Sequence, residues 1–133
     1  MPRYIKNVEQ QRARQAYRFV ETIQQNAILA KDYKSHIRSL PMMIKNNGIN
    51  NAFAFVLSKS KEGNAYQVID TQMREWFDIT TESSFVEYLI KLDSLPYRKI
   101  TIETLAFLSW LKRFAEGLIE DPKTENKEVK NGN

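Results

Sequence analysis

The side chains that most often carry catalysis are scarce in this sequence. His36 is its single histidine, and cysteine is absent. A lone histidine cannot build a two-histidine metal site, and without cysteine it has no thiol to activate. Thiolate catalysis, disulfides and cysteine-based zinc sites are therefore excluded. His36 lies in a polar stretch between Ser35 and Ile37, where we expect a surface or capping role.

The carboxylates do not form a pair suited to general acid–base catalysis. Asp70 and Glu75 are five residues apart, so on a helix they point in different directions. Glu116, Glu120 and Asp121 cluster at the end of a predicted helix, where we expect no enclosed pocket. Acid–base catalysis needs carboxylates whose pKa values are shifted by such a pocket. The sequence therefore predicts no catalytic residues, no metal site, no cofactor and no small-molecule substrate.

Basic side chains are unevenly distributed along the chain. Residues 1–61 hold 11 Lys and Arg against three Asp and Glu, whereas residues 62–133 hold nine against 13. The basic half is suited to a polyanion, and the acidic half to another protein or to the basic half of a second copy. Ordinary solvated helix surface with an accidental split explains the charges equally well.

Apolar spacing and the low number of turn residues indicate an all-α fold. Four glycines and four prolines are few for a β protein of 133 residues, and 42% of the residues are hydrophobic, enough for one core. Asn7 and Gln10 form a weak capping box before the first helix. We predict a single-domain bundle of about six helices, at residues 8–30, 33–46, 52–57, 65–77, a short helix from Phe85, and 101–119.

Several predicted helix boundaries depend on proline or asparagine. Pro41 lacks a backbone donor, so we expect either a kink or a helix restart there. Asn50 is expected to cap the helix at 52–57, whose apolar run should be buried on all sides; a buried strand is the alternative. Residues 95–98, which include Pro96, are expected to form a turn.

The predicted domain organisation is an N-terminal extension at residues 1–7, the helical bundle at 8–120 and a polar, disordered tail at 121–133. The N-terminus has no apolar signal core, and no apolar run approaches the roughly 18 residues that a membrane span requires. We therefore expect a cytoplasmic protein with no membrane contact. Within the bundle, Glu103 is the expected ion-pair partner of Arg12 or Arg113, with solvation of these arginines as the alternative.

Three blocks of sequence, in this order, resemble one family. They are QQRA at 10–13; LPMMIKNNGI at 40–49 leading into AFAFVLSK at 52–59; and Tyr97-Arg98 with ETLAFL at 103–108 and WLKRFAEG at 110–117. Over about residues 8–120 the chain resembles the small subunit of the type III-B (Cmr-type) CRISPR RNA-guided interference complex. It departs from that pattern in the loop at 80–84 and in the polar tail.

The resemblance implies a non-catalytic α-helical subunit. Several copies would stack as a minor filament beside the RNA-binding backbone subunits and line a basic channel along the guide–target duplex. RNA cleavage would belong to the backbone subunit, and nucleotide cyclisation and DNA cutting to the large subunit. The expected partners are other subunits, further copies of this chain, guide RNA and target RNA. From the basic half and the resemblance together, we predict these phosphate contacts: Arg14, Arg18, Lys45, Lys59, Lys61, Arg98 and Lys112.

Two other functions fit parts of the sequence. A protein–protein scaffold with little RNA contact fits the acidic half and an apolar residue, Phe107, that is displaced from the main stripe of its helix and is the predicted interface anchor. A helix-turn-helix DNA binder would use the turn at 46–50. The helix after that turn, at 52–57, is apolar and unsuited to reading base edges.

Overall fold

Every regular element in the described part of the chain is an α-helix. The computed structural model describes residues 7–121. Its six helices are α2 (Val8–Gln24), α3 (Ala27–Asn47), α4 (Ile49–Lys59), α5 (Ala65–Trp76), α6 (Phe85–Leu89) and α7 (Ser94–Leu118). The prediction of an all-α, single-domain bundle of about six helices is confirmed. The predicted extension at 1–7 and tail at 121–133 lie outside the described residues, except for Asn7 and Asp121.

Side-chain caps begin four of these helices. The side-chain oxygens of Asn7, Asn26, Asn64 and Ser84 accept hydrogen bonds from backbone N–H groups three residues on, at the starts of α2, α3, α5 and α6. These groups have no partner inside the helix, so each cap satisfies one of them. The weak capping-box signal at Asn7 thus marks the start of α2 correctly.

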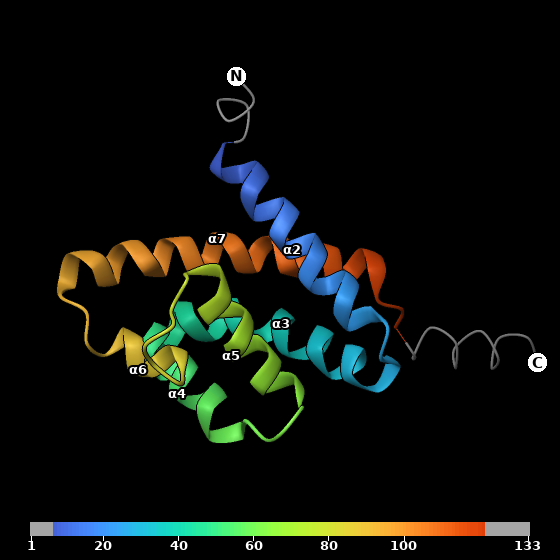
Figure 1. Ribbon diagram of the computed structural model, residues 1–133, viewed down its shortest axis with the longest axis horizontal. Coiled ribbons are helices and arrows are strands. Elements are labelled where there is room, and N and C mark those ends of the chain that lie inside the picture. Colours follow the sequence, from blue (N-terminus) through green and yellow to red (C-terminus); the bar gives the residue numbers. More distant parts are fainter. Residues whose placement is uncertain (1–6, 122–133) are drawn as a thin grey trace, which may run out of the picture.

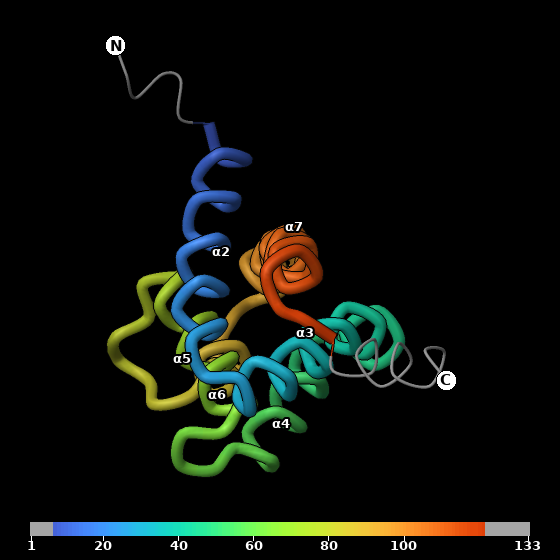
Figure 2. Tube along the Cα trace, turned by 90° about the vertical axis from the view of Figure 1, so that its right-hand side faces the viewer, coloured from blue at the N-terminus to red at the C-terminus, as the bar shows by residue number. Residues whose placement is uncertain are grey.

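Helix α3 lies at the centre of the fold. It contacts α2, α4, α5 and α7, whereas α7 packs mainly against α2 and α3. In Figures 1 and 2, α7 lies beside α2 on one side of the molecule, and α4 lies on the opposite side. The fully buried large side chains of α3 are Tyr33, Ile37 and Leu40. The hydroxyl of Tyr33 donates to the side-chain oxygen of Gln72 on α5 at 2.6 Å, so this buried polar group is satisfied.

The boundary between the first two helices differs from the prediction. Helix α2 ends at Gln24 rather than near residue 30, and α3 starts at Ala27 because Asn26 caps it. Helix α3 then runs through Pro41 to Asn47 without a restart. A proline inside a helix removes one hydrogen bond. Burial of Leu40 and Ile44 on either side holds the helix together.

Two further predicted boundaries are wrong. Helix α4 begins at Ile49 after Gly48, so Asn50 is in its first turn instead of capping it. The predicted turn at 95–98 is part of α7, which begins at Ser94. Pro96 is tolerated there because the first N–H groups of a helix have no intrahelical acceptor. Helix α4 is also not buried on all sides, since Leu57 is 48% exposed.

Phe107 is a core residue and not an interface anchor. Its side chain is completely buried. Its ring stacks on Trp76 with centroids 4.5 Å apart and meets Phe19 edge-on at 5.9 Å. The side of α7 on which it lies is covered by residues of α2 and α5, so Phe107 has no surface to offer a neighbour.

None of the described helices combines the length and the apolar character that spanning a membrane requires.

Candidate nucleic-acid interface

The seven predicted phosphate contacts are all exposed, but they do not form one surface. Arg14 and Arg18 lie on α2, Lys59 and Lys61 lie at the end of α4, and the other three lie on α3 and α7. Within the described residues none of the seven makes an ion pair. Their charges are therefore available to a polyanion.

Arg14 and Arg18 project from the side of α2 opposite the core. They are one turn apart, and the core-facing positions of the helix are held by residues such as Ala16 and Val20. Arg18 also borders an open hollow of about 490 Å³ between α2 and α5, together with Glu75. This pair of arginines faces away from the α3 side of the bundle.

Lys59 is the last residue of α4 and Lys61 follows it in the chain, and α4 lies on the side of the molecule away from α7 (Figure 2). The ammonium of Lys59 is 5.7 Å from the centroid of the Phe55 ring, which gives it a cation–π contact. These two lysines lie at the end of a different helix from Arg14 and Arg18, and α2 and α4 are not among the helix pairs that pack extensively against each other.

The remaining predicted residues join a larger basic surface along α3 and α7. On α3, basic residues recur at intervals of three, four and seven residues, which places them on one side of the helix. On α7, Arg98 precedes Glu116 by five full turns at about 3.6 residues a turn, and Lys112 precedes it by one turn. We define the α3–α7 basic face as Lys31, Lys34, Arg38, Lys45, Arg98 and Lys112.

Two direct contacts and one close approach show that this side of α3 lies against α7. The Arg38 guanidinium donates to the Glu116 carboxylate at 2.8 Å, and the Lys34 ammonium donates to the Ile119 carbonyl at 2.7 Å. At the other end, a Cβ on Gly48 would stand 3.7 Å from the Tyr97 hydroxyl. The two helices are therefore antiparallel, with the end of α3 beside the start of α7.

Sequence reasoning did not select Lys31, Lys34 or Arg38 as contacts. Their spacing with Lys45 was the available signal, but spacing alone did not show that α7 would add its own cations to the same surface. Lys34 is almost fully buried and its ammonium is bound to the end of α7. It contributes a fixed positive charge, whereas Lys31, Lys45, Arg98 and Lys112 are exposed.

The Glu116 carboxylate lies within the α3–α7 basic face, paired with Arg38. The hydrogen bond from Arg38 lowers the pKa of Glu116, and the charges of Arg38, Lys34 and Lys112 lower it further. The same hydrogen bond raises the pKa of Arg38. Both groups are therefore ionised at neutral pH, and basic residues outnumber acidic ones on this surface.

His36 and Asp70 have structural partners within the fold. Burial lowers the pKa of His36, and its ring stacks on the Tyr66 ring with the two ring centroids 3.9 Å apart. The buried Asp70 accepts hydrogen bonds from Arg74 and from the backbone N–H of Phe85, which fixes the start of α6 against α5. No cluster of metal-binding side chains occurs among residues 7–121.

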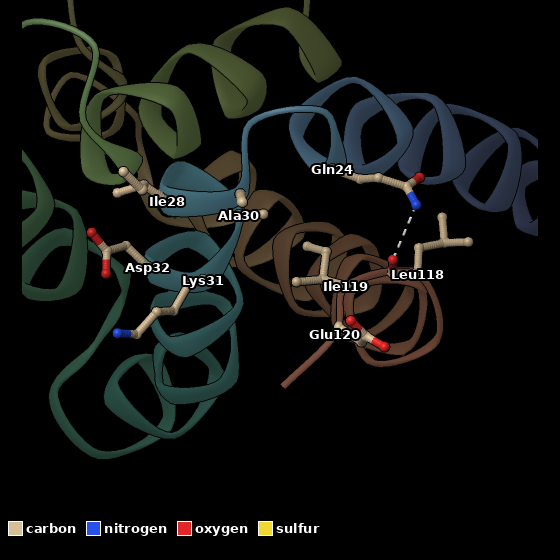
Figure 3. Close-up of a pocket in the computed structure, with 9 residues that line it drawn as sticks. Gln24, Ile28, Ala30, Lys31, Asp32, Leu118, Ile119 and Glu120 are labelled. Atoms are coloured by element: carbon tan, nitrogen blue, oxygen red, sulfur yellow. Dashed lines mark hydrogen bonds between the residues drawn. The ribbon is translucent and has the colours of Figure 1, made fainter. Parts of the chain in front are cut away.

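An open hollow of about 680 Å³ lies where α2, α3 and the end of α7 meet (Figure 3). Ile28, Leu118 and Ile119 supply apolar surface to it. Gln24, which also lines it, uses its side-chain amide to bind the Leu118 carbonyl at 3.1 Å. The polar side chains shown in Figure 3 do not converge on one point, as a catalytic site would require.

Comparisons with known proteins agree with this architecture. The family described as CRISPR-associated protein (Cas_Cmr5) matches residues 8–118. The CRISPR system Cmr subunit Cmr5 of Thermus thermophilus is 30% identical over 90 residues, covering 68% of this chain and 77% of its own. The protein of the same name from Thermotoga maritima is 28% identical over 124 residues, covering 91% and 92%.

A solved structure shows the same fold. It is the X-ray crystal structure of a CRISPR-associated Cmr5 family protein from Thermus thermophilus, with a TM-score of 0.76 and 27% sequence identity. The match covers 86% of this chain and 100% of that one.

Proposed function

This chain belongs to the Cmr5 family of CRISPR-associated proteins, and from that membership we propose that it is a non-catalytic subunit of an RNA-guided effector complex that contacts the RNA backbone. The relatives are named as subunits of a CRISPR Cmr complex, which supports a role in assembly with other subunits. Guide and target RNA are the polyanions that such a complex would bring to a basic surface.

The α3–α7 basic face is the observation that carries the proposal. Along α3 its cations extend over about 21 Å at 1.5 Å per residue. Arg98 and Lys112 add charge from the adjacent helix, and neither is neutralised by an ion pair in the described part of the chain. A row of charges of this length suits a polymer with regularly spaced phosphates.

Contacts of this kind do not read sequence. Lys and Arg on a helix surface neutralise phosphates whatever the bases are. The described aromatic side chains pack mainly against one another or against the core, so no row of exposed rings offers stacking to unpaired bases. Sequence specificity would come from pairing between guide and target, as in other RNA-guided systems.

Arg14 and Arg18 on α2, and Lys59 and Lys61 at the end of α4, are proposed as further phosphate contacts. Because they face other directions, they would meet RNA presented by a neighbouring copy or by a different part of the path. Stacking of several copies as a minor filament would supply that arrangement. Charge reversal at Arg14 and Arg18 in the assembled complex tests the α2 pair. The affinity for target RNA should fall, and its dependence on salt concentration should become weaker.

The α7 helix offers a matched experiment for the basic face itself. In the assembled complex, Arg98→Gln with Lys112→Gln removes two charges from the face. Lys99→Gln with Arg113→Gln removes two charges from the next positions on the same helix, which lie about 100° further round its axis. Target-RNA affinity is measured by titration across a range of salt concentrations.

The salt slope is the change in log affinity per unit change in log salt concentration. The first variant should make this slope shallower by about 0.7–0.9 for each phosphate that a copy of the chain no longer neutralises. The second variant should change it much less. Equal effects of the two pairs would show that the complex responds to net charge and that the α3–α7 basic face is not the contact surface.

A structural role through protein–protein packing is the second candidate. Leu95 and Ile102 are two turns apart on α7, and they are 59% and 65% exposed. An apolar pair of this kind suits contact with another subunit or with a second copy. Native mass spectrometry of complexes carrying Leu95→Gln and Ile102→Gln should show fewer copies of this chain. Unchanged copy number together with weakened RNA binding would exclude this role for the pair.

A further inference from the structure

Glu116 is the one carboxylate that projects into the α3–α7 basic face from within its two helices, and its surroundings resemble those of a bound phosphate. Arg38 donates to it from α3 at 2.8 Å. Lys112 lies one turn before it on α7, and Lys34 lies one turn before Arg38 on α3. Three cations from two helices therefore surround one anion.

The contact between Arg38 and Glu116 is at the surface and can be exchanged. Both side chains are 44% exposed. Exposed ion pairs contribute little to stability, because water and salt screen them and because two long side chains must be held in place. Opening this pair therefore costs the fold little.

A phosphodiester is a better partner for Arg38 than a single carboxylate at this position. The guanidinium presents a planar set of donors that binds two phosphate oxygens at once, whereas Glu116 receives one hydrogen bond from it. Lys34 stays in place as a fixed charge, since its ammonium is bound to the Ile119 carbonyl. Lys112 is exposed and free to turn toward the same anion.

We propose that Glu116 occupies a phosphate-binding position in the free chain, and that an RNA phosphodiester displaces it to bind Arg38 and Lys112. The inference rests on the proposed function, because it assumes that RNA reaches the α3–α7 basic face. It adds a contact residue, Arg38, and gives Glu116 the role of an internal competitor that limits affinity. RNA is favoured over an acidic protein side chain because the row of cations continues along α3 to Lys45. A single carboxylate would contact only the cations around Arg38, whereas a chain of phosphates would use the whole row.

The pKa of Glu116 supports this role. The hydrogen bond from Arg38, and then the surrounding positive charges, lower it, so the group remains an anion throughout the neutral range. Asp121, whose charge also raises the pKa of Arg38, is a second acid near the same guanidinium. Removing Glu116 alone would therefore weaken the competition without abolishing it.

The test compares two single substitutions in the assembled complex. Glu116→Gln removes the competing charge and keeps the size of the side chain. Glu120→Gln removes the same charge four residues later, just beyond the end of α7, at an exposed position that makes no ion pair within the described residues. Affinity for target RNA is measured over a salt series, and thermal unfolding of each free chain confirms that both variants fold.

Glu116→Gln should raise RNA affinity about 3- to 10-fold at low salt and steepen the salt slope by about 0.7–0.9 per copy. Glu120→Gln should raise affinity by less than about twofold. In a chain that also carries Arg38→Gln, the gain from Glu116→Gln should largely disappear, because the phosphate then lacks the arginine that Glu116 was blocking.

Four outcomes would overturn the inference. Equal gains from both Gln substitutions would mean that only net charge matters. No gain from Glu116→Gln, in a complex whose RNA affinity falls with Arg98→Gln and Lys112→Gln, would remove the competitor role and leave the proposed function standing. If Glu116→Gln changes the number of copies of this chain in the complex but not the RNA affinity, the ligand of Arg38 is a carboxylate of a neighbouring protein. If neither the Glu116 nor the Arg98 and Lys112 variants alter RNA affinity, the proposed function fails as well.

Discussion

Glu103 joins three helices through a single carboxylate. Arg12 on α2 donates two hydrogen bonds to it, at 2.8 and 2.5 Å, and the indole N–H of Trp76 on α5 donates a third at 3.1 Å. The hydrogen bond to Glu103 is the main cause of the raised pKa of Arg12. The side chains of Arg12 and Glu103 are only 16% and 23% exposed, so water screens this pair less than it screens the contact between Arg38 and Glu116.

We predict that Glu103→Ala lowers the free energy of unfolding by about 2–3 kcal/mol. The loss is larger than for a surface pair because the substitution leaves both the Arg12 guanidinium and the Trp76 N–H without their acceptor. Urea unfolding at neutral pH measures it. Glu62→Ala, at an exposed loop position, is the control and should change stability by no more than about 0.5 kcal/mol. Equal losses for the two variants would contradict a structural role for the Glu103 network.

For single residues, the sequence predicts the ion pair between Arg12 and Glu103 correctly but does not predict the burial of Phe107. Glu103 is a predicted partner for Arg12 because few acids occur on its helix, and the structure confirms that pairing. Arg113, the other candidate, makes no ion pair within the described residues. The prediction for Phe107 is wrong because its position on α7 lies at the edge of the apolar stripe. Only the packed structure shows that Trp76 and Phe19 cover that edge.

The turn between α3 and α4 requires a glycine. Gly48 has φ 90° and ψ 156°, and its backbone N–H caps the Ile44 carbonyl at the end of α3. This region of backbone conformation is open essentially to glycine alone. The turn itself lies beside the start of α7, since a Cβ on Gly48 would stand 3.7 Å from the Tyr97 hydroxyl.

Gly48→Ala should destabilise the chain by about 1–3 kcal/mol, because the backbone conformation is strained for any residue with a Cβ. Gly117 gives a matched comparison: it is exposed within α7, and a Cβ there would meet nothing within 4 Å. Gly117→Ala should therefore stabilise by about 0.5–1 kcal/mol. Chemical denaturation of both variants checks the two signs. A neutral or stabilising effect of Gly48→Ala would mean that the turn adopts another conformation.

Helices are easier to predict than their ends. Asn7 marks the start of α2 because a side-chain acceptor is a local signal. Pro41 predicts a kink or a restart, and α3 continues through it without a restart; Pro96 predicts a turn, and α7 includes it. The effect of a proline depends on how many helical hydrogen bonds remain and on how well its neighbours are buried, and both are set by tertiary packing.

The grouping of cations belongs to the scale of the whole molecule. The sequence identifies exposed basic residues, but it cannot show that Arg14 and Arg18 face away from Lys45, Arg98 and Lys112. That separation follows from the antiparallel packing of α3 on α7 and from the position of α2 beside them (Figure 2). One copy of the chain therefore presents three separate basic surfaces, of which the α3–α7 basic face is the largest.

A single free chain should consequently bind RNA weakly and with strong salt dependence. Four exposed cations of the α3–α7 basic face, Lys31, Lys45, Arg98 and Lys112, contacting one phosphate each would give a salt slope of about −3 to −4. Affinity would then fall about 50-fold or more between roughly 50 and 200 mM salt. Two RNAs of unrelated sequence should bind equally, because no contact reads a base.

Linking two copies in tandem should raise RNA affinity by about 100-fold or more without any new contact, provided that the linker lets both basic faces engage one RNA strand. Fluorescence anisotropy with labelled single-stranded RNA compares the single and the tandem chain. A tandem chain in which one copy carries Lys45→Gln, Arg98→Gln and Lys112→Gln is the control, and it should return to the affinity of the single chain. A clear preference between the two RNAs, or a tandem chain no tighter than its control, would mean that the chain recognises RNA by something other than rows of charge aligned between copies.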